Sequence, residues 1–171
     1  MVEPWMRGTL TEVEPVRRGV VHALELAEED VAWWCDGLSE KEMFARHFGL
    51  PPVAFQLRHM VRSMDRLLTY AEGRVLDEAQ LAALGTEMAP GTVDEVMGEF
   101  RVGLKRATGR VLAIDPDSFA EARGIGRKML PTTVAGLLIH CAEHTQRHVG
   151  QMVTTVKMVR GREQRTGNRE Q

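Results

Sequence analysis

Residues 132–159 carry the longest run of helical periodicity in this chain, and they read TTVAGLLIHCAEHTQRHVGQMVTTVKMV. The inward-facing side chains recur every three or four residues, which is the spacing of one face of an α-helix. This face comprises Val134, Leu137, Leu138, Cys141, His148, Met152, Thr155 and Val159. Gly161 follows, and glycine commonly ends helices. The pattern therefore predicts one long helix over residues 132–159.

Three earlier stretches, residues 14–34, 52–71 and 92–112, show the same periodicity. The last of them starts at Thr92, and Glu95 follows three residues later, which is the signature of a capping box at a helix N-terminus. No stretch shows the sustained alternation of polar and apolar residues that marks a half-buried strand. We therefore predict an all-α protein with four long amphipathic helices, arranged as a four-helix bundle.

The connections between these helices are less regular. A short helix is predicted from Asp77 to Leu84 with Asp77 as its cap, in a connection that ends at Pro90 and Gly91. Residues 115–131 are predicted to form a loop. Because the connection before residue 92 is long, the pattern leaves open whether the bundle has simple up-down topology or crossovers.

Composition narrows the class of protein. The chain has 171 residues, 43% of them apolar and 27% charged, with a net charge of −2. We expect one globular domain over residues 1–161 and a polar, disordered tail over residues 162–171. Two cysteines, Cys35 and Cys141, cannot build a disulfide framework. No apolar run approaches the roughly 18 residues of a membrane-spanning helix, and no signal peptide is visible. We therefore expect a cytoplasmic protein that binds neither membranes nor nucleic acid.

Histidines are concentrated in the last predicted helix. Three of the six, His140, His144 and His148, are spaced by four residues and so share nearly one helix face. Two imidazoles one turn apart can bind one metal ion, whereas His140 and His148 are about 12 Å apart along the axis. The apolar phase turns His144 and His148 inward and leaves His140 nearer the boundary. Hydrogen-bonded core histidines without a metal are the alternative interpretation of this pair.

His59 is a candidate third ligand. It follows the helical stripe of residues 52–71 next to Met60, and the small Ser63 one turn later leaves room beside an imidazole. In an antiparallel bundle this helix can face the last one, so that His59 joins the inward pair. Three neutral imidazoles suit Zn, Ni, Fe or Cu and leave coordination positions open, as catalytic metal sites do.

Two motifs carry a resemblance to a known family. Residues 55–70, FQLRHMVRSMDRLLTY, and residues 143–151, EHTQRHVGQ, resemble the second-helix and fourth-helix motifs of the DinB-like (YfiT-like) superfamily. The resemblance covers most of the chain. It implies a bundle that holds a divalent metal, Zn, Ni or Fe, through His59, His144 and His148. Homodimers are frequent in this superfamily, and some relatives are, or are proposed to be, transferases or isomerases that use low-molecular-weight thiols.

This chain departs from the family pattern at one position. Gln56 stands where family members often carry a histidine, which leaves His59 intact and changes its surroundings. Ligating imidazoles usually donate their other N–H to a polar group. Three residues near the candidate ligands in sequence are candidates to accept that N–H, although each can equally be a solvated polar residue: Glu143, Asp65 and Gln151.

The sequence supports a metal-dependent enzyme of the thiol S-transferase type that acts on a small molecule, without naming a catalytic residue. The alternative is a non-catalytic metal-binding module, either a stress-response binding protein or a structural dimer, and a bundle without metal is a third reading. Cys141 can approach the site but is more often a small buried apolar residue. Of the adjacent Trp33 and Trp34, one is a candidate for a homodimer interface.

Overall fold

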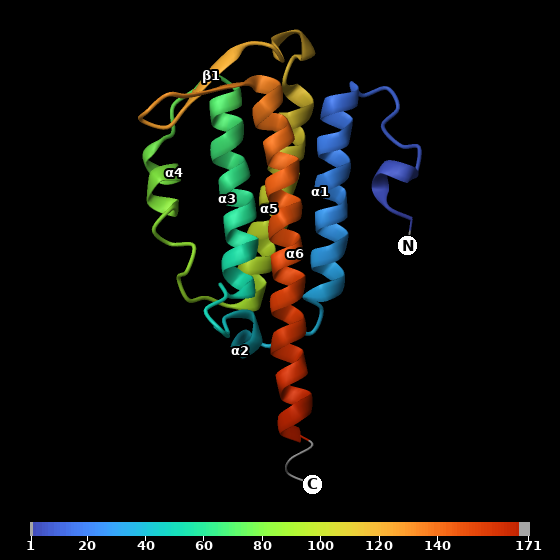
Figure 1. The fold of residues 1–171 in the computed structure, drawn as a ribbon, viewed down its shortest axis with the longest axis vertical. Coiled ribbons are helices and arrows are strands. Elements are labelled where there is room, and N and C mark those ends of the chain that lie inside the picture. The colour runs from blue at the N-terminus through green and yellow to red at the C-terminus, as the bar shows by residue number, and fades with distance from the viewer. Residues whose placement is uncertain (1, 168–171) are drawn as a thin grey trace.

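Four long helices form the body of the protein. The computed structural model describes residues 2–167. The long helices are α1 (Pro15–Trp34), α3 (Val53–Ala71), α5 (Val93–Ala113) and α6 (Val134–Gly167). They lie side by side as a bundle (Figure 1). The prediction of an all-α four-helix bundle is confirmed.

The order of the helices around the bundle follows from their packing. α3 packs against α5 and α6, and α1 packs against α6 and α5. The colour gradient in Figure 1 shows that α1 and α6 run in one direction while α3 and α5 run in the other. Consecutive long helices α1 and α3 are therefore diagonal, as are α5 and α6, so the topology contains crossovers. α3 and α6 are antiparallel neighbours, which is the arrangement that a shared histidine site requires.

Short elements fill the connections. They are η1 (Pro4–Met6), α2 (Glu40–Met43), α4 (Glu78–Ala83) and η2 (Pro116–Ser118). α2 lies at one end of the bundle, and the connection with α4 runs along the outer side of α3 (Figure 1). The predicted cap of α4 is present, since Asp77 Oδ1 accepts a hydrogen bond from the Gln80 N–H over 2.7 Å.

A small β-hairpin occupies part of the stretch predicted as a loop, so that prediction is wrong there. Strand β1 (Ala122–Ile125) pairs antiparallel with β2 (Leu130–Thr133). Gly126 and Met129 adopt positive φ angles in the turn between them. Strands of four residues are too short for alternation to reveal them. The hairpin covers the end of the bundle opposite α2 (Figure 1).

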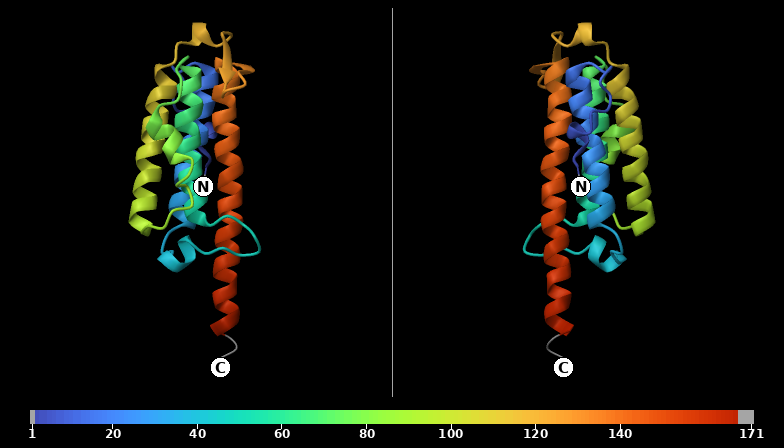
Figure 2. Two further views of the ribbon diagram at one scale, coloured as in Figure 1. Left: turned by 90° about the vertical axis from the view of Figure 1, so that its left-hand side faces the viewer. Right: turned by 90° about the vertical axis from the view of Figure 1, so that its right-hand side faces the viewer.

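Helix boundaries agree with the sequence at the capped N-terminus of α5 and differ at the end of α6. Thr92 and Glu95 form both hydrogen bonds of the predicted capping box. α6 continues through Gly161 to Gly167 and extends past the other helices (Figure 2). An exposed glycine inside a helix costs only about 1 kcal/mol, so it does not have to end one. Residues 168–171 of the predicted tail lie outside the described residues, and the domain boundary at residue 161 stays a prediction.

α3 is enclosed on several sides. Leu57, Met60 and Met64 are fully buried in the core, and polar residues of the same helix, Gln56 among them, are buried as well. This follows from its position between α5, α6 and the α4 connection. Polar side chains on α3 therefore need partners from these neighbouring elements.

α5 and α3 approach each other closely at Gly103. A Cβ atom at Gly103 would lie 2.5 Å from the Cβ of Val61, whereas a Cβ atom at Gly98 would meet nothing within 4 Å. Gly103 thus allows the two helices to pack closely, and Gly98 has no such role.

We expect opposite effects from the same substitution at these two glycines. Gly103→Ala should lower the free energy of unfolding by about 1–3 kcal/mol because the added methyl group overlaps Val61. Gly98→Ala, the matched control, should raise it by up to about 1 kcal/mol through helix propensity. Urea unfolding followed by circular dichroism measures both. Equal effects at the two positions would contradict the close contact.

Candidate metal centre

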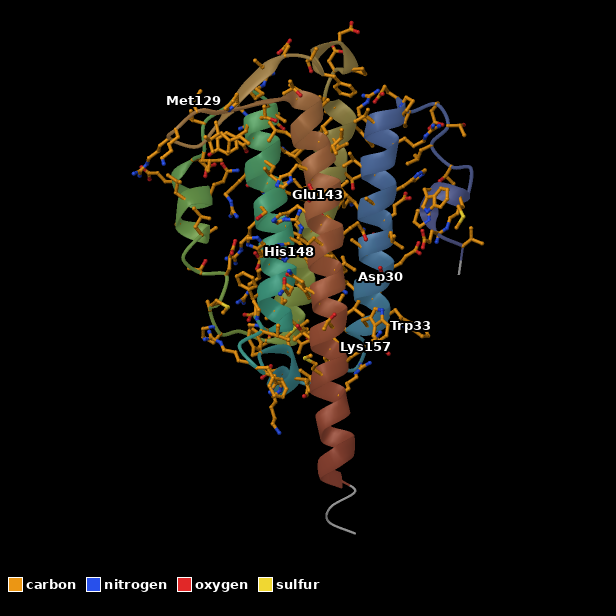
Figure 3. All side chains as sticks on the ribbon, viewed as in Figure 1. Asp30, Trp33, Met129, Glu143, His148 and Lys157 are labelled. Atoms are coloured by element: carbon orange, nitrogen blue, oxygen red, sulfur yellow. The ribbon has the colours of Figure 1, made fainter. Side chains whose placement is uncertain are left out.

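Three imidazoles from two helices meet inside the bundle. His59 comes from α3, and His144 and His148 come from successive turns of α6. One nitrogen of each ring can be chosen so that all three lie within 4.8 Å of one another. The ring centroids are 4.5 Å apart for the α6 pair, and His59 lies 4.6 Å from His148 and 5.1 Å from His144. Figure 3 shows His148 between the α3 and α6 ribbons.

The ring of His59 is held through its Nδ1 atom. Nδ1 lies 2.8 Å from Oε2 of Glu87, a buried carboxylate that also faces Arg66 at 3.4 Å. The Phe55 ring stacks on His59 with centroids 5.2 Å apart. With a carboxylate oxygen as the acceptor, the Nδ1–H of His59 is the donor and Nε2 keeps its lone pair. Nε2 also lies 3.3 Å from the Ser63 hydroxyl oxygen.

His148 is held in the same way by a neutral group. Its Nδ1 atom lies 2.5 Å from Oε1 of Gln56, whose side chain is 1% exposed. Because an amide oxygen can only accept, this contact places the proton on Nδ1 and frees Nε2 for a ligand. Gln56 is the position at which the sequence departs from the family motif, and the structure shows its contact with a candidate ligand.

His144 supplies the test of whether a cation suits this site. Its Nδ1 atom is buried and has no hydrogen-bond partner among residues 2–167. A buried polar atom without a partner is unfavourable, and coordination by a metal ion is one way to satisfy an imidazole nitrogen. Three neutral nitrogen donors also match the chemistry of Zn, Ni and Fe sites. The residues present therefore fit a divalent metal.

His144 and His148 are held in the neutral state, which is the state of an imidazole that binds metals. Burial lowers the pKa of both His144 and His148 to about 4, and the neighbouring imidazoles act in the same direction. The side chain of Gln151 acts in the opposite direction on His148 and does not cancel the effect. Both rings are consequently neutral near pH 7, with lone pairs available to a cation.

His140 does not join the three converging rings. Its side chain is 42% exposed and contacts Glu143, although its ring centroid lies 5.5 Å from that of His144. Glu143 also pairs with Arg147 on the surface of α6. The structure thus separates His140 from the His144 and His148 pair, as the apolar phase predicts.

The other polar candidates lie away from the ligands or pack as apolar residues do. Asp65 pairs with Arg110 at 2.7 Å and accepts a hydrogen bond from Gln80. Cys141 is buried, and burial raises the pKa of its thiol to about 12, so the thiol stays protonated. Of Glu143, Asp65 and Gln151, only Gln151 affects the pKa of a candidate ligand, His148.

Glu87 is the site residue that sequence reasoning missed. It lies 28 residues after His59, in the connection between α4 and α5. Three arginines on successive turns of α3 hold this connection: Arg58 bonds the Ala89 carbonyl, Arg62 bonds the Ala83 carbonyl and the Thr86 hydroxyl, and Arg66 pairs with Glu87. No motif or periodicity marks a carboxylate whose position depends on the path of a loop.

The stability of the metal-free protein should fall as the pH is lowered from about 6.5 to about 4. Below 6.5 the unfolded chain takes up protons on His144 and His148, whereas the folded chain does not until about pH 4. Urea unfolding in the presence of a chelator, repeated at several pH values, measures this loss. His144→Gln and His148→Gln should each make the pH dependence shallower in this window. An unchanged slope in both variants would contradict the assigned burial of these rings.

Comparison with known proteins gives one family match. A search of curated proteins finds no match. The family model of the DinB superfamily matches residues 23–152. This range contains α3, most of α1, the whole of α5 and the part of α6 that carries both histidines. The chain therefore belongs to the DinB superfamily.

Proposed function

We propose that this protein is a metal-dependent enzyme of the thiol S-transferase type that acts on a small molecule. His59, His144 and His148 hold a divalent metal, Zn, Ni or Fe, in this proposal. The observation that carries it is the convergence of three imidazole nitrogens from α3 and α6 within 4.8 Å. Membership of the DinB superfamily supports the same reading.

The donor set favours an anionic co-ligand. Three imidazoles bring no negative charge and leave positions open for a further ligand, as catalytic sites do. A divalent cation held there lowers the pKa of a bound thiol or water and so supplies a nucleophile at neutral pH. A site of net positive charge attracts a thiolate in preference to a neutral molecule.

The residues around the ligands keep protons and rings in place. Glu87 accepts a hydrogen bond from the Nδ1–H of His59, and Gln56 accepts one from the Nδ1–H of His148. Arg66 donates to Glu87 and to the Ser63 hydroxyl, which holds the carboxylate in position. Such partners fix the tautomer and direction of a ligating ring, and their loss typically weakens metal binding about 10–100-fold.

Homodimer assembly is part of the same proposal. Trp33 is 70% exposed near the end of α1, while Trp34 packs against the ammonium group of Lys157. Figure 3 shows Trp33 and Lys157 on this face. A large exposed aromatic side chain is a common interface residue.

None of the described helices combines the length and apolar character needed to cross a bilayer.

Removing one ligand should lower metal binding. We expect His59→Ala, His144→Ala and His148→Ala each to weaken it by more than about tenfold, because each takes one of three donors from the site. Elemental analysis of protein purified without a histidine tag, with competition against a chromophoric chelator, measures the effect. His140→Ala is the matched control and should bind as the wild type does. Equal metal content in all four variants would reject the ligand assignment.

Thiol binding at an open position should be visible by spectroscopy. In the Co²⁺-substituted protein, 2-mercaptoethanol is expected to change the absorption spectrum and add a sulfur-to-cobalt charge-transfer band. His148→Ala with the same amount of Co²⁺ serves as the control and should not show the saturable change. A wild-type spectrum unaffected by thiol would instead indicate a closed site, as in a non-catalytic metal-binding module.

A further inference from the structure

An open cavity of about 370 Å³ lies between the start of α3 and the outer side of α6. Its size is within the range of small-molecule sites. Residues 50 and 51, in the loop before α3, form one wall. The rest of the lining comes from Gln56 on α3 and, on α6, from Arg147, Gly150, Gln151, Thr154 and Thr155. The cavity therefore adjoins His148 through Gln56, which contacts both.

Gln56 presents a donor group to this cavity. Its Oε1 atom is taken by His148, and its side chain is 1% exposed. Gln56 lines the cavity, and its Nε2 group is not one of the fully buried atoms that lack a partner, so this group can meet solvent or a ligand there. An amide N–H that meets solvent in a cavity can exchange water for the acceptor of a ligand.

The charge of the cavity wall favours an anion. Among the residues that line the cavity, Arg147 is charged and none is an aspartate or a glutamate. Arg147 pairs with Glu143, but both side chains are 53% exposed, and such surface pairs are weak. A guanidinium has five N–H donors, so it can bind a second acceptor without leaving the first.

The remaining wall gives the cavity further polar groups and open space. The hydroxyls of Thr154 and Thr155 donate to the carbonyls of Gly150 and Gln151 over 2.9 and 3.0 Å. A Cβ atom at Gly150 would meet no other group within 4 Å. A larger side chain at Gly150 would consequently enter the cavity without disturbing the core, which makes this position a suitable probe.

We propose that this cavity binds the carboxylate of a small-molecule ligand through Gln56 Nε2 and Arg147. The carboxylate subsite stands on the cavity itself. Its use in a reaction at the three histidines rests on the function proposed above.

Two matched probes test the subsite: 3-mercaptopropionate and 3-mercapto-1-propanol, which differ in the carboxylate. Titration of the metal-free, ¹⁵N-labelled full chain is followed through the side-chain amide signals of Gln56 and Gln151. The acid should shift the Gln56 signal saturably and bind about tenfold more tightly than the alcohol, as expected for a charge-assisted hydrogen bond. Arg147→Gln should remove most of that preference.

Filling the cavity should abolish binding of the acid. Gly150→Met places a side chain in the cavity, and Gly109→Met, at an exposed helical glycine with open space around it, is the matched control that should bind normally. Circular dichroism verifies that both variants keep their helices. Equal affinities for acid and alcohol, or an acid preference unaffected by Arg147→Gln, would overturn the subsite.

The same probes separate this proposal from the proposed function. A thiol-dependent change in the Co²⁺ spectrum without a shift of the Gln56 signal retains the function and overturns the carboxylate subsite. A shift of the Gln56 signal by the acid without any thiol-dependent Co²⁺ spectrum supports the subsite and overturns the thiol function.

Discussion

α3 and α6 lie side by side in opposite directions, and the candidate metal centre depends on that contact. Ring nitrogens from two helices can approach within 4.8 Å only where the two helices are direct neighbours. The crossover topology makes them neighbours although a long connection and α5 separate them in sequence. The close approach at Gly103 fixes the opposite side of α3, against α5. The rings of the site are thus positioned by helix packing rather than by a flexible loop.

Two chemically different groups hold the Nδ1 protons of the candidate ligands. His59 donates to the carboxylate of Glu87 and His148 to the amide of Gln56. The centre therefore combines a ring from α3 that is oriented by a carboxylate with a ring from α6 that is oriented by a neutral amide. Glu87 also places a negative charge close to the imidazoles, partly offset by Arg66.

The sequence was sufficient to predict the helices and the group of histidines, and the reasons are local. Helix periodicity and the Thr92 capping box depend on residues close together in the chain, and the His144 and His148 spacing places both rings on one face. The partner of His59 could not be predicted, because Glu87 reaches it only through the folded path of the α4 connection. The hairpin was missed because each strand has four residues. The sequence marks Gln56 as a departure from the family motif, but its contact with His148 depends on how α3 and α6 are rotated relative to each other.

The row of Arg58, Arg62 and Arg66 along α3 has an implication for how the α4 connection can vary in length. Backbone carbonyls at Ala83 and Ala89 and the side chain of Glu87 are tied to successive turns of one helix. Insertions or deletions between these anchor points would shift Glu87 out of register with His59. Extra residues are better accommodated before Asp77, where Val75 is 87% exposed. For loop grafting, the same connection therefore has one segment that tolerates changes in length and one whose length is fixed by its anchor points.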